Sequence, residues 1–161
     1  MDFNIASKKQ KVLAQDVMKK EVISVQPETS VKEIARIMVE NKISALPVVN
    51  KFNEILGVVS ESDLINKVVK PHEPGITTLL FHAAIMPSDE VVGYRKAMSR
   101  WNAQTAAEAM TSPAICVDKN ESIETVGRIM LDEKVKRVFL VEEGHIVGVI
   151  SLSVFVEMLL K

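Results

Sequence analysis

The sequence predicts an α/β (α+β) fold made of two tandem β-α-β-β-α repeats with a helical insert between them. Two observations predict this fold. Residues of the two halves match at a nearly constant spacing, and each half carries the same succession of short apolar runs and one-sided helical stripes. The 161 residues suffice for two small repeats packed as one unit, and 47% of them are apolar, which supplies a core.

The repeat consists of matching residues that lie 92 positions apart in the first part of each copy. The spacing falls to 91 after a polar turn, where the first copy has one residue more than the second. Homologous repeats tolerate such a slip in a hairpin loop. Matching pairs include Met18 with Met110 and Ile37 with Ile129 at the first spacing, and Gly57 with Gly148 and Ser60 with Ser151 at the second.

Each repeat predicts the same elements in the same order. A short extended segment, 22–25 or 114–117, precedes a helix whose apolar residues recur on one side. Ser30 is the expected N-cap of the first helix, and Glu33 completes a capping-box pattern. Two strands rich in β-branched residues then pair through a polar turn, and a last helix closes the repeat. The expected ranges are 46–49, 55–59 and 61–69 in the first repeat, and 138–141, 146–150 and 152–160 in the second.

The insert between the repeats is apolar, and Pro71, Pro74 and Gly75 interrupt regular structure at its start. We expect helices over 77–86 and 91–101. Tyr94, Met98 and Trp101 fall roughly on one face of the second helix, which either adds to the core or contacts a second copy of the chain. A further short helix is expected over 4–15. The predicted boundaries are 1–15 for an N-terminal arm, 16–69 for the first repeat, 70–104 for the insert and 105–161 for the second repeat.

Composition and charge argue against several classes of protein. The net charge is −1, and a dedicated nucleic-acid binder usually carries a clear basic excess, so we expect no nucleic-acid partner. No run reaches the ~18 apolar residues of a membrane helix, and the N-terminus lacks the pattern of a signal peptide. A single cysteine permits no internal disulfide. We therefore expect a cytoplasmic protein without a membrane span.

Signatures of catalysis and of metal binding are missing from the sequence. It contains no phosphate loop of the GxxxxGK(S/T) type, no HExxH, no GxSxG and no CxxC pair. None of the three histidines has metal-ligand spacing to a cysteine or to another histidine. Cys116 stands in an extended apolar run, where a buried, inert thiol is expected. We expect no enzyme, no metal site and no obligatory cofactor.

Doubled motifs carry a resemblance to a known family. They comprise the entrances Asp16-Val17-Met18 and Ala107-Glu108-Ala109-Met110, the stretches 42–49 and 134–141, and the turns 57–63 and 148–151. In this order the chain resembles a pair of CBS domains, the cystathionine-β-synthase type, also called a Bateman module. The resemblance covers nearly everything except the arm and the insert.

The resemblance implies an architecture and a class of ligand. The two repeats of such a pair are related by a pseudo-twofold axis and leave two related clefts at their interface, and two pairs commonly form a disc-like homodimer. Family members commonly bind adenine-containing ligands in these clefts. The expected ligand is an adenine nucleotide, AMP, ADP or ATP, with S-adenosylmethionine and cyclic di-AMP as further candidates.

The most informative motif is Gly57-x-x-Ser60-x-x-Asp63. Ser60 stands where a helix begins, so its hydroxyl and the free N–H groups suit a phosphate. Asp63 lies near one helical turn further on, and an ionised carboxylate accepts two hydrogen bonds, which suits paired ribose hydroxyls. A structural interpretation stands beside this one, with Ser60 as an N-cap and Asp63 as a first-turn charge favoured by the helix dipole.

A second stretch lies just before and within the next strand. The resemblance implies that it meets the adenine, with backbone groups at the edge of the ring and small or apolar side chains along its faces. Ser24, from the first extended segment, is expected to line the same pocket. The alternative is a plain buried strand with an irregular entry. The assigned residues of this stretch are Ile43, Ser44, Ala45 and Pro47.

The second repeat contributes cations to this expected site. Lys136 and Arg137 occupy the places of Ser44 and Ala45, and pseudo-twofold packing would bring them towards the phosphates of the first repeat's ligand. They also suit an exposed basic edge that discourages sheet aggregation. Val154 replaces Asp63 in the second repeat, and valine binds no ribose, so we expect one competent and one degenerate site.

These observations predict a regulatory ligand-binding module for adenosine-containing ligands, and not an enzyme. One alternative is a degenerate pair that serves only as a scaffold for dimerisation or partner docking. Another is a signalling adaptor whose ligand state controls a separate enzyme or transporter, with the apolar insert as the contact surface.

Overall fold

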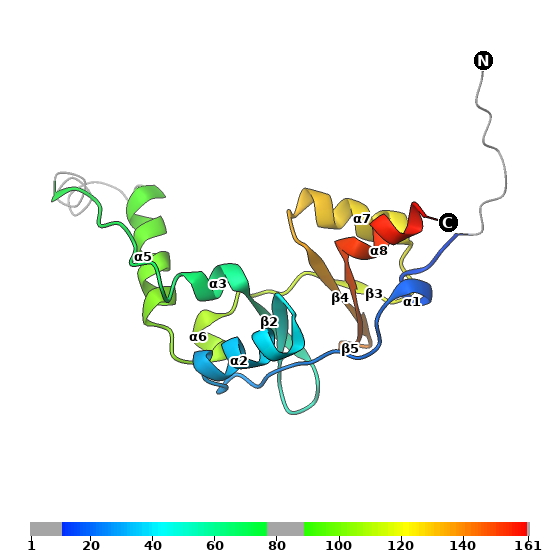
Figure 1. Ribbon diagram of the computed structural model, residues 1–161, viewed down its shortest axis with the longest axis horizontal. Helices are drawn as coiled ribbons and strands as arrows, with labels where there is room; N and C mark the ends of the chain where they lie inside the picture. The colour runs from blue at the N-terminus through cyan, green and yellow to red at the C-terminus, as the bar shows by residue number, and fades with distance from the viewer. Residues whose placement is uncertain (1–10, 77–88, 161) are drawn as a thin grey trace, which may run out of the picture. The chain divides into compact units, whose positions relative to one another are not determined.

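The structure is a computed structural model that describes residues 11–76 and 89–160 (Figure 1). These residues form two compact units. The central unit holds residues 23–76 and 89–114, and the terminal unit holds residues 11–22 together with 115–160. Each unit has a hydrophobic core of its own.

The central unit is built around an antiparallel hairpin. Strands β1 and β2 pair in the register Ala45↔Ser60, with a bulge between Val48 and Val49. Val25 adds one parallel bridge to Val48, which is the outcome for the extended segment expected over 22–25. The elements are α2 (Val31–Asn41), β1 (Ala45–Val49), β2 (Ile55–Ser60), α3 (Glu61–Ile65), α5 (Asp89–Asn102) and α6 (Ala106–Ala109).

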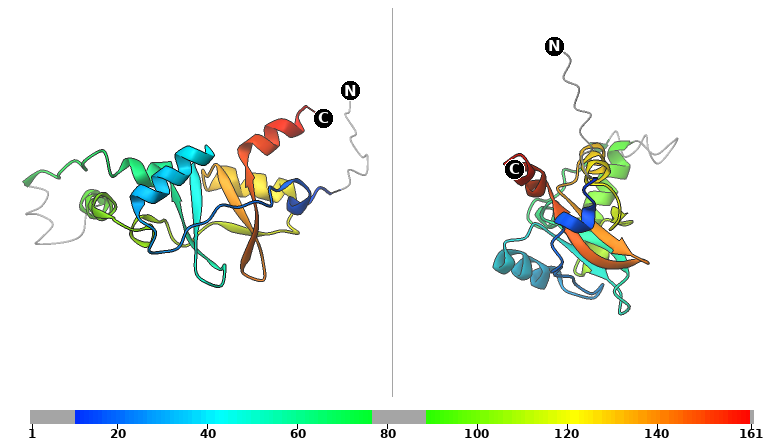
Figure 2. Two further views of the ribbon diagram at one scale, coloured as in Figure 1. Left: turned by 60° about the horizontal axis from the view of Figure 1, so that its bottom comes forward. Right: turned by 90° about the vertical axis from the view of Figure 1, so that its right-hand side faces the viewer.

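The terminal unit repeats this plan with a fuller sheet. Strand β3 pairs in parallel with β4, and β4 pairs antiparallel with β5, so the strand order is β3-β4-β5. The turn of the β4–β5 hairpin projects from the sheet, as does the turn of β1–β2 in the central unit (Figure 2). The elements are α1 (Ala14–Val17), β3 (Cys116–Asp118), α7 (Ile123–Asp132), β4 (Arg137–Glu142), β5 (His145–Ser151) and α8 (Leu152–Met158).

The predicted α/β fold of two repeats is confirmed, and the four hairpin strands begin and end within one residue of their expected ranges, whereas β3 (Cys116–Asp118) begins two residues later than the segment expected over 114–117. The closing helices are shorter than expected. Helix α3 ends at Ile65, after which the chain continues without helix through residue 69, and α8 ends at Met158. Val68 and Val69 are exposed there, so no apolar packing extends the helix. The helix expected over 91–101 is α5. The helix expected over 77–86 and residues 4–10 of the expected N-terminal helix lie outside the described residues.

Local signals account for the starts of the first helix of each repeat. The Ser30 hydroxyl accepts a hydrogen bond from the Glu33 amide at 3.2 Å. The Glu33 carboxylate turns instead to Arg36, at 2.8 Å, so only half of the predicted capping box forms. The second copy behaves alike, with the Ser122 hydroxyl accepting from the Thr125 amide at 3.1 Å.

The entrance segment of each repeat packs against the hairpin of the other repeat. Lys19, after α1, exchanges backbone hydrogen bonds of 3.0 and 2.9 Å with Val149 in β5. Thr111, after α6, does the same with Val58 in β2, at 2.9 and 3.0 Å. Each compact unit therefore combines the entrance segment of one repeat with the body of the other.

Glycine makes this packing possible in both units. A Cβ atom at Gly57 would lie 2.7 Å from the Met110 sulfur and 2.8 Å from the Thr111 carbonyl oxygen. A Cβ atom at Gly148 would overlap the Met18 sulfur in the same way. The entrance methionine of one repeat thus lies on the strand glycine of the other, and only glycine leaves room for it.

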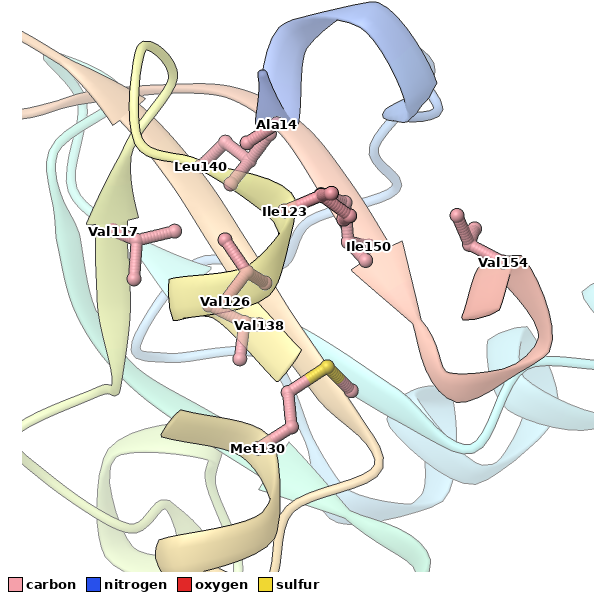
Figure 3. Packing of buried hydrophobic residues seen from close by; sticks show 9 residues of the cluster. All are labelled: Ala14, Val117, Ile123, Val126, Met130, Val138, Leu140, Ile150 and Val154. Atoms are coloured by element: carbon pink, nitrogen blue, oxygen red, sulfur yellow. The ribbon is translucent and has the colours of Figure 1, made fainter. Parts of the chain in front are cut away.

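The core of the terminal unit gathers side chains from every element of that unit (Figure 3). Val154 belongs to this apolar cluster and is 8% exposed. The central unit has an equivalent core in which Ile34 and Met38 of α2 are buried, as the one-sided stripe predicts. The residues of the terminal core are Ala14, Val117, Ile123, Val126, Met130, Val138, Leu140, Ile150 and Val154.

Candidate functional site

Asp63 is the one buried acidic side chain among the described residues, and it lies at the junction of β2 and α3. Ser60 ends the strand and precedes the helix with an extended backbone, as the motif predicts. The Ser60 amide and hydroxyl both donate to the Oδ2 atom of Asp63, at 2.9 and 2.6 Å. This pairing holds the carboxylate at the start of α3, where the helix dipole favours negative charge.

The second carboxylate oxygen of Asp63 has two more distant partners. The Nη2 atom of Arg100 lies 3.3 Å from Oδ1, and the Thr111 hydroxyl lies 3.4 Å from it. Arg100 also donates to the Thr111 hydroxyl at 2.8 Å. We call Ser60, Asp63, Arg100 and Thr111 the carboxylate cluster.

Sequence reasoning missed two members of this cluster. Arg100 comes from α5 in the insert, which has no counterpart in the repeat pattern and so carries no spacing signal. Thr111 directly follows the entrance motif of the second repeat, which ends at Met110. This position next to the motif was the only sequence signal that pointed to Thr111. Near the end of α5, the Trp101 carbonyl oxygen accepts a hydrogen bond from the Lys67 ammonium group at 2.7 Å.

The stretch assigned to the adenine runs beside the carboxylate cluster. The Ser44 carbonyl oxygen accepts from the Glu61 amide at 3.0 Å, and Ala45 lies opposite Ser60 in the hairpin. Ile43 is half-buried. The structure therefore brings this part of the chain and the start of α3 together within one unit.

Two further assigned residues differ in exposure. Pro47 is almost fully buried, which suits a core position in β1. Ser24 is exposed and adjoins Val25, whose amide donates to the Pro47 carbonyl oxygen at 3.0 Å. Ser24 is therefore the member of this pair whose side chain is free to meet a ligand.

Lys136 and Arg137 occupy the predicted equivalent places in the terminal unit. The Lys136 carbonyl oxygen accepts from the Leu152 amide at 3.2 Å, and Arg137 lies opposite Ser151, as Ser44 and Ala45 do in their unit. Lys136 is exposed and Arg137 half-buried, and within residues 11–76 and 89–160 neither forms an ion pair. Their approach to the phosphates of a ligand held by Asp63 stays a prediction.

The equivalent junction of the terminal unit has different chemistry. Val154 takes the place of Asp63 and is part of the apolar core, and Lys19 takes the place of Thr111. The Ser151 hydroxyl lies 2.8 Å from that of Ser153. This junction offers no carboxylate to a ribose.

Other reactive groups are few in the described parts of the chain. No three histidine, cysteine or acidic side chains gather there as metal ligands. Cys116 in β3 is half-buried and not fully buried as expected, and this burial raises the pKa of its thiol. Among the helices of these parts, none has the length and apolar character to cross a bilayer.

The repeated segments match a family over most of the chain. Residues 14–70 and 106–161 match the CBS domain. The chain belongs to the CBS domain family. The family resemblance inferred from the doubled motifs is thereby confirmed. Helix α5, which supplies Arg100, lies outside both matched segments of this CBS pair.

Two curated relatives that match most of this CBS pair are distant from it in sequence. It is 24% identical over 155 residues to protein MJ1426 of Methanocaldococcus jannaschii, a match that covers 92% of each chain. It is 25% identical over 134 residues to CBSX1, a chloroplastic CBS domain-containing protein of Arabidopsis thaliana. That match covers 83% of this chain and 57% of CBSX1, so this chain spans a little over half of that relative.

Two solved structures have a similar fold. One is CBSX2 of Arabidopsis thaliana in complex with AMP, with a TM-score of 0.74 and 24% identity over 92% of this chain and 97% of that one. The other is the CBS domain pair of protein MJ0100 in complex with 5′-methylthioadenosine and S-adenosylmethionine. It has a TM-score of 0.69 and 17% identity over 93% of this chain and 97% of that one. At these identities the likeness establishes the fold.

Proposed function

We propose that this CBS pair is a regulatory module that binds an adenosine-containing ligand of the AMP, ADP or ATP class, and is not an enzyme. The observation that carries the proposal is Asp63, a nearly buried carboxylate at a helix start within the Gly57-x-x-Ser60-x-x-Asp63 motif. Two structural neighbours, bound to AMP and to S-adenosylmethionine with 5′-methylthioadenosine, support an adenosine ligand.

Asp63 is the proposed ribose acceptor, and its two oxygens differ in how firmly they are held. Oδ2 has short hydrogen bonds from Ser60, whereas the partners of Oδ1 lie at 3.3 and 3.4 Å, beyond the usual range for strong hydrogen bonds. A ribose hydroxyl at 2.7 Å or so would be the better donor to Oδ1. Oδ1 is therefore the proposed point of contact with the ribose.

The remaining parts of the ligand have proposed partners as well. Backbone groups of Ile43, Ser44 and Ala45 are the proposed hydrogen-bond partners of the adenine edge. Their position beside Ser60 in the hairpin supports this assignment. Ser24 is proposed to lie at the rim of the pocket. The predicted partners of the phosphates are the cations of the second repeat at the places equivalent to Ser44 and Ala45. Those cations are Lys136 and Arg137.

We further propose that two chains form a homodimer. The support is a set of apolar residues that are exposed at equivalent places in both repeats. Val68 is 84% exposed and Leu159 is 85% exposed, and Val39 and Leu131 form a second such pair at 78% and 74%. Apolar residues that are exposed at equivalent places in both copies favour a contact surface, because isolated exposed residues would not be expected to recur in this way. Ile65 with Val156, and Val69 with Leu160, extend the set.

A scaffold without nucleotide is the second candidate function. It is favoured by the carboxylate cluster, in which every hydrogen bond to Asp63 is already supplied by the protein. In that case the same duplicated apolar residues dock a second copy, a regulated enzyme or a transporter, and Asp63 only stabilises α3. The two candidates differ in whether the free chain binds an adenine ligand.

Isothermal titration calorimetry of the purified chain separates the two candidates. AMP, ADP, ATP, S-adenosylmethionine and cyclic di-AMP are each titrated, and thermal unfolding is followed with each ligand in excess. The sensor requires saturable binding by at least one of them and a rise in Tm, since a ligand that binds only the folded state stabilises it. Absence of heat and of any shift at millimolar concentrations of all five would leave the scaffold.

A further inference from the structure

Arg100 is the one cation of the described residues that reaches the buried carboxylate of Asp63. Its Nη2 atom lies 3.3 Å from Oδ1, and its side chain is 25% exposed where that of Asp63 is 6% exposed. The same nitrogen donates to the Thr111 hydroxyl at 2.8 Å. Arg100 therefore borders the position proposed for the ribose, although it belongs to an insert outside both CBS segments.

The contact between Arg100 and Asp63 competes with a ribose. Oδ2 is held by Ser60 at short range, so a ribose hydroxyl must take Oδ1 and displace Arg100 or share that oxygen with it. Displacing one partner of a largely buried ion pair leaves a cation without its counter-charge, which is unfavourable. A neutral ligand that binds to Asp63 thus leaves the Arg100 guanidinium uncompensated.

A phosphate on the same ribose removes this disadvantage. A guanidinium carries five donors in a planar fork and binds phosphate oxygens in a bidentate manner. An arginine released from Oδ1 would stay beside the bound ribose, where a negative 5′ group would attract its guanidinium. A cationic 5′ group, such as a sulfonium, is instead repelled.

Resting on the proposed function, we propose that Arg100 is a specificity-determining residue. It makes the Asp63 site select nucleoside 5′-phosphates over adenosine ligands whose 5′ group is neutral or cationic. The selection arises because only an anionic ligand replaces the counter-charge that Arg100 loses when the ribose takes Oδ1 of Asp63.

Calorimetric titration of AMP and of adenosine into matched variants tests this selection. The variants are the wild type, Arg100→Gln, Arg100→Lys and the control Arg95→Gln, which removes an exposed charge from the same helix. We expect Arg100→Gln to weaken AMP binding about tenfold and to leave adenosine binding unchanged or tighter, because one charge-assisted contact is lost and a competitor is removed. Arg100→Lys keeps part of the preference, and Arg95→Gln keeps all of it.

The ratio of the two dissociation constants is the deciding readout. A structural role for Arg100, in which its loss merely loosens α5, would weaken AMP and adenosine by the same factor, and this result would overturn the inference while leaving the proposed function intact. A wild type that binds neither AMP nor adenosine would overturn this inference, and the proposed function would fall only if ADP, ATP, S-adenosylmethionine and cyclic di-AMP also failed to bind. Thermal unfolding of each variant shows whether it folds, and Arg100→Lys carries the test if Arg100→Gln does not.

Discussion

Ser60 donates twice to one oxygen of Asp63, through its amide at 2.9 Å and its hydroxyl at 2.6 Å. The pairing joins the last residue of β2 to the first turn of α3 and aims the other carboxylate oxygen at Arg100 and Thr111. Asp63 thus has a structural contact on one oxygen and a more weakly held oxygen on the other. The proposed contact with a ligand therefore falls on Oδ1, while the contact at the helix start falls on Oδ2.

Asp63→Ala is expected to weaken adenine-nucleotide binding by about one to two decades. A hydrogen bond to a charged group contributes ~1.5–3 kcal/mol, and ~1.4 kcal/mol corresponds to tenfold in Kd. Titration calorimetry measures the change, and Glu61→Ala is the matched control, since it removes an exposed carboxylate from the same helical turn. Equal affinities of the wild type and Asp63→Ala would reduce Asp63 to a helix-start charge.

Gly57→Ala is expected to destabilise the central unit by about 1–3 kcal/mol, as overpacking of a filled site does. The added Cβ would lie 2.7 Å from the Met110 sulfur and 2.8 Å from a backbone oxygen, and backbone cannot move aside cheaply. Gly93→Ala is the control, because a Cβ there meets nothing within 4 Å. In a helix interior that change should stabilise by up to about 1 kcal/mol. Urea unfolding of both variants gives the two signs, and a neutral Gly57→Ala would mean that Met110 does not pack as described.

The chain is expected to bind one nucleotide, not two. Val154 lies in the apolar core at the place equivalent to Asp63, and no carboxylate is available at that junction for a second ribose. The stoichiometry from calorimetric titration with AMP should therefore be one per chain. Two sites of equal affinity would show that backbone contacts suffice without the carboxylate.

Replacing Val68 and Leu159 by serine is expected to weaken the proposed homodimer. Both side chains are more than four-fifths exposed and hold equivalent places in the two repeats, so removing them costs little within the chain itself. Native mass spectrometry over a dilution series measures the dissociation. Phe52→Ser is the control, since Phe52 is exposed in a hairpin turn and has no counterpart in the shorter turn of the second repeat. A wild type that is monomeric at every concentration would end the dimer proposal.

Cys116 is expected to react slowly with iodoacetamide in the folded protein. Burial raises the pKa of its thiol, so less thiolate is present at a given pH than at an exposed cysteine. Raising the pH or unfolding the chain in urea should speed the reaction, because each increases the reactive thiolate or its access. Mass spectrometry follows the alkylation, and a folded rate equal to the unfolded rate would contradict an inert cysteine.

The carboxylate cluster shows where sequence reasoning ends. Ser60 and Asp63 are three residues apart, so the strand-to-helix pattern predicted that both lie at the start of one helix, but it did not predict the hydrogen bonds between them. Arg100 and Thr111 reach the same carboxylate from 37 and 48 residues further along the chain. No local preference specifies such a contact, and Arg100 lies in the part of the chain without a second copy to compare.

By itself the sequence determined the duplicated α/β plan and the strand-to-helix junction that holds Asp63. Hydrophobic periodicity and helix caps depend on residues close together in the chain, and the repeat appears when one half of the sequence is compared with the other. Only the tertiary structure decided that Met110 lies on Gly57 and Met18 on Gly148, so that each unit borrows the entrance of the other repeat. It also decided that Arg100 faces Asp63. These contacts depend on how distant segments fill space against one another, which the order of residues along one strand or helix does not reveal.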